Sequence, residues 1–300
     1  MSRTEPAGNR PRLQPFMIRI EDYPPGFEED GRLRSAFMRE LTLHVLNHPA
    51  TAKVDGSKSA VSVPRTLIRY WHDPHEVPDD VAACLTSWDR LRSEGCQFRM
   101  FSDASAATYI GERYGPRHLK AFVRCRHPAM RCDYLRLCFV FAEGGLYVDA
   151  DDVLLGDGWK TLFADDALKL QPLCYDIASA AMIPASKIWQ GDLSTTDRIF
   201  YVNNDPLAAP AGHPVLQRAL ERATDKLLGD DPRPEIQSTT GPGNLTAALA
   251  AHARELVLAD EPLDFVLLKD WDAIAETRWD LSYRGDARNW RNMDALDSQH

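Results

Sequence analysis

The hydrophobic pattern is most regular over residues 131–155, which read RCDYLRLCFVFAEGGLYVDADDVLL. Apolar side chains recur at helical spacing over residues 132–143 and predict a helix with a buried face. Asp133 and Arg136 are three residues apart, so they share a separate strip of this helix. The Gly144-Gly145 pair ends the helix, because glycine adopts left-handed backbone angles without steric cost.

A short apolar run at residues 146–148 follows the glycines and predicts a buried strand. Asp149, Asp151 and Asp152 come next, where such a strand is expected to reach the surface. Ligands of open α/β sheets bind at the carboxyl ends of strands. These three carboxylates therefore mark the expected position of a site.

Strands and helices alternate along the rest of the chain as well. This alternation is typical of an α/β fold that is rich in parallel strands. The helical pattern covers residues 31–47, 77–92, 102–114 and 212–228. The strand pattern covers residues 64–71, 97–101, 199–202 and 263–268, with further elements at residues 159–163 and 168–173.

The N-terminal region differs in composition from the rest of the chain. Residues 1–15 are polar and rich in proline, which predicts disorder. Residues 52–62 are small and polar, as is typical of a linker. We therefore predict an N-terminal extension over residues 1–61, with a disordered tail and one helix, and an α/β domain over residues 62–300.

The 300 residues are 44% hydrophobic and 26% charged, with a net charge of −9. This balance is typical of a soluble acidic protein and argues against nucleic acid as the main partner. No apolar run approaches the roughly 18–20 residues of a membrane span, and the first residues lack the apolar core of a secretory signal. The six cysteines form no CxxC pair, so we expect free thiols in a reducing, cytoplasmic compartment.

Asp149 and Asp151 have the chemistry of a site for a hard divalent cation. Two carboxylates one residue apart at a strand end can bind one ion from the same turn. Ligands that are all oxygen favour Mg²⁺ or Mn²⁺, with water or substrate phosphate in the remaining positions. An acidic triplet is also typical of a solvated turn, so the weight of this pair comes from the pattern around it.

The stretch CDYLRLCFVFAEGGLYVDADD resembles the core of the DXD-containing "sugar region" glycosyltransferases, family 32. This family includes initiating α-mannosyltransferases and is more distantly similar to the large glucosylating toxins. Its core is an Asp-x-x-Arg helix, a Gly-Gly break and an apolar strand that ends in Asp-x-Asp. The positions that match it are Asp133, Arg136, Gly144, Gly145, Asp149 and Asp151.

The resemblance implies a Rossmann-like mixed sheet of the GT-A type, flanked by helices. It also implies a retaining transferase that moves a sugar from a nucleotide-diphosphate sugar to a hydroxyl of a saccharide or another small acceptor, with UDP-sugars favoured over GDP-sugars. Asp149 and Asp151 would bind Mn²⁺ or Mg²⁺, and Asp149 would also contact the donor. Asp133 and Arg136 would grip donor hydroxyls, and these two residues with Asp151 are the implied catalytic group.

Four further residues are implied to bind the donor or the metal. Trp71 ends the strand at residues 64–71 and is a candidate for stacking on the base, although a core role fits equally well. Asn204 either binds donor hydroxyls or holds the backbone. The family often places a His or Ser followed by a Trp near its end. The nearest text here is YRGDARNW, which lacks the His but offers Trp290 as the closing residue and Asn289 as an oxygen ligand.

Two other readings of the acidic motif remain open. A strand that ends in Asp-x-Asp also describes haloacid-dehalogenase-like phosphohydrolases, but their motif usually lies on the first strand of the domain. A calcium-binding module without catalytic activity would use the acidic residues between Asp149 and Asp157. Their spacing, however, lacks the glycine at position six and the glutamate at position twelve of the known calcium loop.

Overall fold

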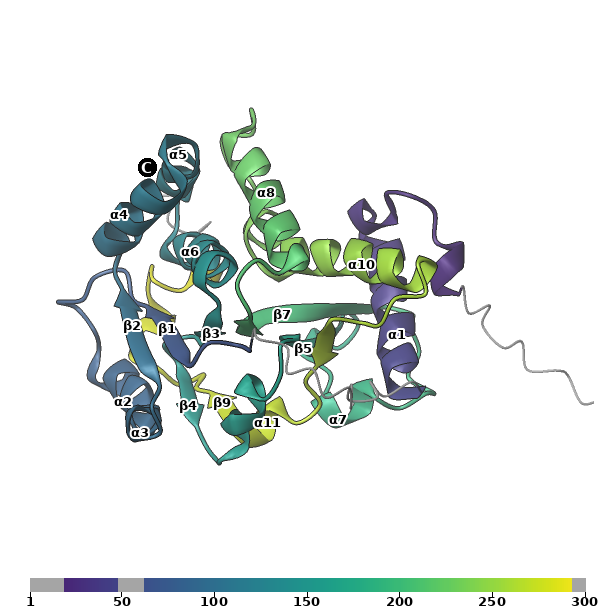
Figure 1. The fold of residues 1–300 in the computed structure, drawn as a ribbon, viewed down its shortest axis with the longest axis horizontal. Helices are drawn as coiled ribbons and strands as arrows, with labels where there is room; N and C mark the ends of the chain where they lie inside the picture. Colours follow the sequence, from purple (N-terminus) through teal and green to yellow (C-terminus); the bar gives the residue numbers. More distant parts are fainter. Residues whose placement is uncertain (1–18, 48–61, 293–300) are drawn as a thin grey trace, which may run out of the picture.

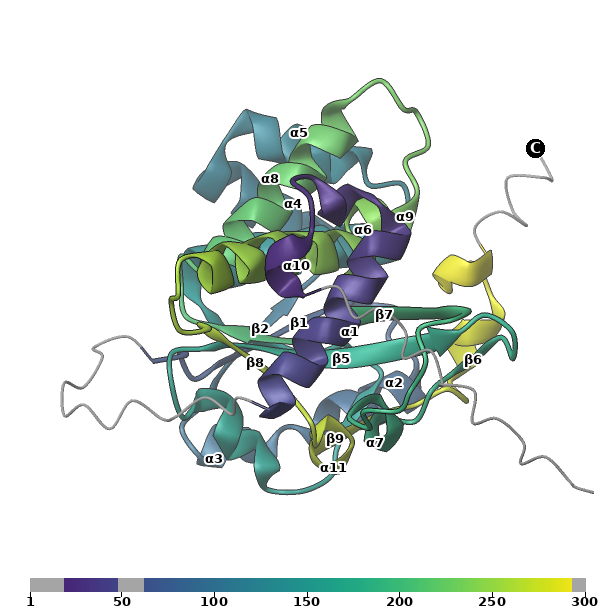
Figure 2. The ribbon, with the colours of Figure 1, turned by 90° about the vertical axis from the view of Figure 1, so that its right-hand side faces the viewer.

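The computed structural model describes residues 19–47 and 62–292 and confirms the predicted mixed α/β class. A seven-stranded sheet lies between layers of helices (Figure 1, Figure 2). The strand order is β2 (Gln97–Phe101), β1 (Thr66–Tyr70), β3 (Gly145–Tyr147), β7 (Arg198–Ala209), β5 (Leu168–Asp176) and β6 (Ala181–Met182), and β8 (Phe265–Leu267) pairs with the start of β5. The tail predicted at residues 1–15 and nearly all of the linker predicted at residues 52–62 lie outside the described residues.

Three parallel strands form one half of the sheet. They are β2 (Gln97–Phe101), β1 (Thr66–Tyr70) and β3 (Gly145–Tyr147). Ile68 pairs in register with Tyr147, so β1 and β3 end at the same edge of the sheet. This edge carries the acidic motif, as expected from the strand ends.

The other half of the sheet is antiparallel, which strand–helix alternation does not predict. Here β7 (Arg198–Ala209) pairs with both β3 and β5 (Leu168–Asp176), and β6 (Ala181–Met182) and β8 (Phe265–Leu267) add to β5. The strand predicted at residues 199–202 therefore runs on past Asn204. Residues 198–202 pair with β5, and residues 207–209 pair with β3 and, at 207 and 208, with β5 as well.

The longer helices cover one face of the sheet (Figure 2). They are α4 (Asp103–Tyr114), α5 (Pro116–Arg124), α6 (Pro128–Glu143), α8 (Pro214–Leu228) and α10 (Pro242–Leu258), with the short α9 (Ile236–Thr239). The other face carries α2 (Asp79–Ser87), α3 (Arg90–Ser93), α7 (Ala185–Ile188), α11 (Trp271–Ile274) and the small sheet of β4 (Asp152–Leu154) and β9 (Ala275–Thr277). No helix in the described ranges is both long and apolar enough to cross a membrane. All six cysteines are buried and free of disulfides.

The helix predicted at residues 31–47 is confirmed as α1 (Gly31–Asn47). It packs against β7 and α10 and contributes Phe37 and Leu41 to the main core. Its Ser35 hydroxyl donates to the Arg198 carbonyl at 3.1 Å and accepts from the Phe200 amide at 2.9 Å. The division of the chain into residues 1–61 and 62–300 stays a prediction.

The single helix predicted at residues 77–92 is wrong, because α2 ends at Ser87 and α3 begins at Arg90. Tertiary contacts cause the break. The indole N–H of Trp88 donates to the Asp152 carbonyl at 3.0 Å, and the Ser87 hydroxyl accepts from the Leu154 amide at 3.0 Å. These bonds fasten the turn to β4, which continued α-helix would not allow.

The two glycines after α6 are required by both backbone angle and space. Gly144 has a φ of 71°, and a Cβ there would lie 2.7 Å from Cδ of Pro64 and 2.8 Å from the amide of Ala211. Gly145 has a φ of 123°, and its Cβ would lie 2.7 Å from the Thr66 carbonyl oxygen. The glycines thus let the helix turn directly into β3 against β1.

His213 links the start of α8 to the segment before β8 and gives a pH prediction. Its Nδ1 accepts from the Val215 amide at 3.3 Å, and its Nε2 lies 3.2 Å from the Asp264 carbonyl, so the neutral ring carries its proton on Nε2. Burial lowers the pKa of His213 below 6.5, against the opposing charge of Asp264. The unfolded chain therefore takes up this proton at higher pH than the folded protein does.

The free energy of unfolding should consequently fall as the pH decreases below about 6.5, by up to about 1.4 kcal/mol per pH unit for one linked proton. We expect His213→Asn, which keeps a capping side chain, to flatten this dependence. Urea denaturation between pH 7.5 and pH 5 measures it. His75→Asn is the matched control, because His75 is exposed. If the free energy of unfolding depended on pH equally in His213→Asn and wild type, the linkage would be contradicted.

Candidate functional site

One cavity of about 900 Å³ opens at the carboxyl ends of β1 and β3. Every site residue predicted from the sequence lines it. These residues are Trp71, Asp133, Arg136, Asp149, Asp151, Asn204, Asn289 and Trp290. They come from segments that are as much as 219 positions apart in the chain (71 to 290), so the fold is what gathers them.

The sheet register explains why three of these segments meet. Trp71 follows β1 and Asp149 follows β3, and the two strands are parallel neighbours. β7 runs antiparallel to β3, with Leu207 opposite Tyr147, so the preceding residues of β7 lie beside the acidic turn. Accordingly, the Asp149 amide donates to a carboxylate oxygen of Asp205 at 3.0 Å.

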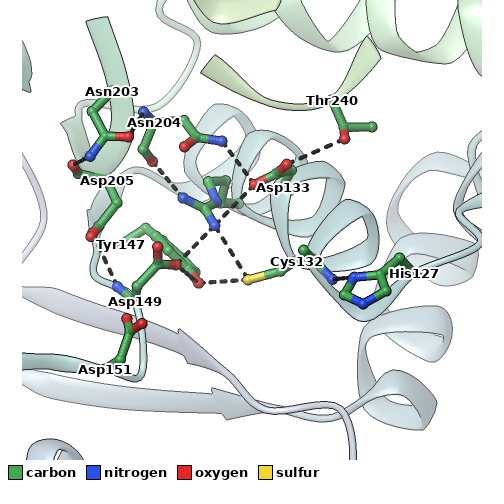
Figure 3. A network of polar contacts seen from close by, with 12 residues as sticks. His127, Cys132, Asp133, Tyr147, Asp149, Asp151, Asn203, Asn204, Asp205 and Thr240 are labelled. Atoms are coloured by element: carbon green, nitrogen blue, oxygen red, sulfur yellow. Dashed lines mark hydrogen bonds and ion pairs between the residues drawn. The ribbon is translucent and has the colours of Figure 1, made fainter. Parts of the chain in front are cut away.

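Arg136 joins helix α6 to β7 and to the acidic turn after β3, in the polar network around Asp133, Asp149 and Asn204 (Figure 3). One terminal nitrogen donates to the Asn204 carbonyl at 2.7 Å, and the other lies 2.9 Å from Asp149 and 3.1 Å from Asp133. Burial alone would lower the pKa of Arg136, but the charge of Asp149 and its other neighbours raises it well above the ordinary value. The guanidinium therefore stays charged and holds two carboxylates together.

Asp133 is buried in the same network. It accepts hydrogen bonds from the Asn204 amide group at 2.8 Å and from the Thr240 hydroxyl at 3.3 Å. Burial raises the pKa of Asp133 to about 6, although Arg136 acts in the opposite direction. The helix strip predicted for Asp133 and Arg136 thus faces the cavity instead of bulk solvent.

Asp149 and Asp151 differ in their surroundings. One oxygen of Asp149 accepts from Arg136 and from the Tyr147 hydroxyl, the latter at 2.8 Å, and the side chain is 34% exposed. One oxygen of Asp151 accepts from the Tyr283 hydroxyl at 2.7 Å and from Arg284. No hydrogen bond from a described residue engages the other carboxylate oxygen of either side chain.

The carboxylates of Asp149 and Asp151 form a donor set that suits a divalent cation. Asp149 and Asp151 each keep one carboxylate oxygen free in the cavity, which suits a hard cation that retains several water ligands. Within the described ranges no cluster of three or more His, Cys, Asp or Glu side chains could enclose a metal. The residues therefore fit an open, two-carboxylate site, whose remaining positions would go to water or phosphate.

The expectation that Asp152 surfaces with its neighbours is wrong. Asp152 is fully buried, because it begins β4 and pairs with Thr277 of β9. Burial and the charge of Asp151 raise the pKa of Asp152 to about 7. Burial also raises the pKa of Asp205 well above its usual range, with the charge of Asp152 acting in the same direction.

Asn289 and Trp290 come from the last described segment. The Asn289 amide group donates to the Arg284 carbonyl at 2.7 Å, and its oxygen accepts from the Arg291 amide at 3.2 Å. The side chain is thus engaged by backbone, and its role as a metal ligand stays a prediction. Trp290 lines the cavity with Arg291 over its ring, at 4.7 Å from the centroid.

Trp71 lines the cavity but is also well packed. Its ring meets Tyr283 edge to face at 5.3 Å, and its N–H donates to the Glu76 carbonyl at 3.1 Å. If Trp71 stacks on the donor base, Trp71→Ala should raise the donor KM, at a cost of about 1–3 kcal/mol, and leave the protein folded. Steady-state kinetics and thermal melting measure this.

Trp88→Ala is the matched control for Trp71→Ala. Trp88 is fully buried outside the cavity, so its loss should lower stability and leave the donor KM of the folded fraction unchanged. If Trp71→Ala unfolded, or if it bound the nucleotide like wild type, Trp71 would be a core residue instead.

Sequence reasoning missed four residues of this site: Tyr147, Asp205, Tyr283 and Arg284. Tyr147 had a local signal, because strand residues two apart share a face and Tyr147 is two before Asp149. The other three reach the site only through strand pairing or through the path of the C-terminal segment. No spacing in the sequence gives that information.

No family model matches the chain. Over 110 residues, 34% of its length, the chain is 26% identical to the initiation-specific alpha-1,6-mannosyltransferase of Saccharomyces cerevisiae. It spans 23% of the length of that relative. A solved structure, the PaToxG glycosyltransferase, aligns over 90% of this chain and 97% of its own, at 12% identity and a TM-score of 0.43. The sequence match confirms the predicted relationship to glycosyltransferases as a distant one.

Proposed function

We propose that the protein is a retaining, metal-dependent glycosyltransferase of the GT-A type. It would move a sugar from a nucleotide-diphosphate sugar, UDP-sugar in preference to GDP-sugar, to a hydroxyl of a saccharide or another small acceptor. The observation that carries the proposal is the Arg136 bridge, which joins Asp133 of the helix to Asp149 at the strand end inside one cavity. The cavity volume of about 900 Å³ would hold a donor and part of an acceptor.

Asp149 and Asp151 would hold Mn²⁺ or Mg²⁺ through their free oxygens. A divalent cation there supplies Lewis-acid chemistry and neutralises negative charge on the departing diphosphate. Asp133 can only accept hydrogen bonds and Arg136 can only donate them, so together they suit neighbouring sugar hydroxyls that do both. Asn204 orients Asp133 through its amide group.

The free, buried thiols favour a reducing compartment, and a cytoplasmic location is part of this proposal. That compartment would also give access to activated nucleotide sugars. The partners proposed are therefore a nucleotide-sugar donor and a small acceptor, without nucleic acid.

A donor screen tests the proposal. UDP- and GDP-sugars are incubated with the protein and Mn²⁺ or Mg²⁺, and release of nucleotide diphosphate is measured with and without excess EDTA. We expect release from one donor class, lost with EDTA and restored by added metal. Full activity in EDTA would reject the metal, and turnover of a phosphomonoester without any sugar transfer would favour a phosphohydrolase.

A further inference from the structure

The positively charged side chains of the cavity are concentrated on the wall formed by residues 284–291, which we call the C-terminal wall. Four arginines line the cavity: Arg136, Arg284, Arg288 and Arg291. The last three belong to one short segment of the chain. Six carboxylates line it as well, from Asp133, Asp149, Asp151, Asp205, Asp272 and Glu276. The rest of the lining is therefore unfavourable for an anionic ligand, and the C-terminal wall is the exception.

Arg291 differs from the other three arginines in its partners. Arg136 is paired with Asp133 and Asp149, Arg284 with Asp151, and Arg288 with Asp286. Within the described ranges no carboxylate lies at ion-pair distance from Arg291. Among residues 19–47 and 62–292, its charge is therefore not neutralised by a direct contact.

Trp279 brings Arg284 and Arg291 together. The guanidinium of Arg284 lies 4.3 Å from the centroid of the Trp279 ring, and that of Arg291 lies 5.3 Å from it. Burial and the nearby charge of Arg284 lower the pKa of Arg291. Two like charges on one indole repel each other, and an anion between them would relieve that repulsion.

The backbone of this segment fixes both arginines. Asn289 donates to the Arg284 carbonyl at 2.7 Å and accepts from the Arg291 amide at 3.2 Å. The Nε of Arg284 donates to the Arg278 carbonyl at 3.1 Å, which holds its guanidinium beside Asp151. No described residue accepts a hydrogen bond from the remaining N–H groups of the two forks, so they suit a planar or multidentate acceptor.

We propose that Arg284 and Arg291, stacked on Trp279, form a subsite for the diphosphate of the donor, next to Asp151. This inference rests on the proposed function. Guanidinium forks match phosphate oxygens in geometry and carry a permanent charge. The two guanidinium charges would offset the repulsion between the diphosphate and the carboxylates that line the rest of the cavity. Asn289 then acts as a positioning residue for the two arginines.

Calorimetry on the full chain with Mn²⁺ tests the subsite. The ligands are UDP, UMP and uridine, and the guanosine series replaces them if the wild type prefers GDP. Arg291→Gln should lower the affinity for the nucleoside diphosphate about 10- to 150-fold, as expected for one lost charge-assisted hydrogen bond. It should affect the monophosphate less and the nucleoside not at all. Arg291→Lys, which keeps the charge without the fork, should lie in between.

Arg278→Gln is the matched control, because Arg278 belongs to the same segment, is 44% exposed at its side chain and does not line the cavity. Arg284→Gln is measured as well, with circular dichroism to verify folding, but Arg291→Gln decides because it breaks no ion pair among the described residues. Unchanged affinity for the diphosphate in Arg291→Gln would overturn the subsite and leave the proposed function standing. If Arg291→Gln lost binding to a sugar phosphate and kept its affinity for the diphosphate, the subsite would also be overturned, because the bound anion would then belong to the acceptor. A wild type that binds neither UDP nor GDP would overturn the proposed function itself.

Discussion

Arg136→Met is expected to lose about 3–5 kcal/mol of its free energy of unfolding, the largest effect of any single change considered for this protein. The guanidinium is 4% exposed and is the shared partner of Asp133 and Asp149. Its removal leaves the buried carboxylate of Asp133, whose side chain is 9% exposed, without its cation, and the desolvation cost of that charge is then not offset. Chemical denaturation at pH 7.5 measures the loss.

A second measurement separates this effect from simple loss of side-chain volume. The pKa of Asp133 is about 6 with Arg136 present and should rise further without it. A group whose pKa is raised by folding costs stability as the pH rises through that value. The defect of Arg136→Met should therefore be smaller at pH 5 than at pH 7.5, and Asp133→Asn should relieve part of it.

Arg218→Met is the control, because Arg218 pairs with Glu255 at 2.8 Å on the surface, with side chains that are 35% and 57% exposed. Exposed pairs contribute about 0–1 kcal/mol. If Arg136→Met cost no more than Arg218→Met, the Arg136 bridge would not organise the site.

Asp133→Asn and Asp151→Asn are expected to separate sugar binding from metal–diphosphate binding. Asp133→Asn should lower the affinity for the intact nucleotide sugar about 10- to 150-fold and leave the affinity for the free nucleotide diphosphate unchanged, since one charge-assisted hydrogen bond is lost. Asp151→Asn should weaken both ligands and reduce turnover by more than about 100-fold, because even residues that only support a metal ligand cost 10- to 100-fold.

The structure makes Asp133→Asn a clean variant. The amide is nearly isosteric, Arg136 keeps Asp149 as a partner, and Asn204 and Thr240 can rearrange their hydrogen bonds around it. Calorimetry with the nucleotide diphosphate and the nucleotide sugar decides, with circular dichroism as a control for folding. If Asp133→Asn bound both ligands and turned over like wild type, the Asp133–Arg136 pair would have a structural role only.

Local signals in the sequence were sufficient for the elements around the acidic motif. The periodicity of α6, the Gly144-Gly145 stop and the strand before Asp149 all appear in the structure where the pattern places them. These features depend on side-chain spacing and backbone angles within a few residues, which the chain determines by itself. The bounds of α1 and the end of α8 at Leu228 follow for the same reason.

Only the tertiary structure decided what surrounds that motif. The antiparallel pairing of β7 with β3 brings Asn204 and Asp205 to the acidic turn, and the pairing of β4 with β9 buries Asp152. The approach of Arg284 to Asp151 joins positions 133 residues apart. Such contacts depend on which strands pair and where the chain end packs. Those choices are made by burial and hydrogen bonding across the whole domain, and no local spacing encodes them.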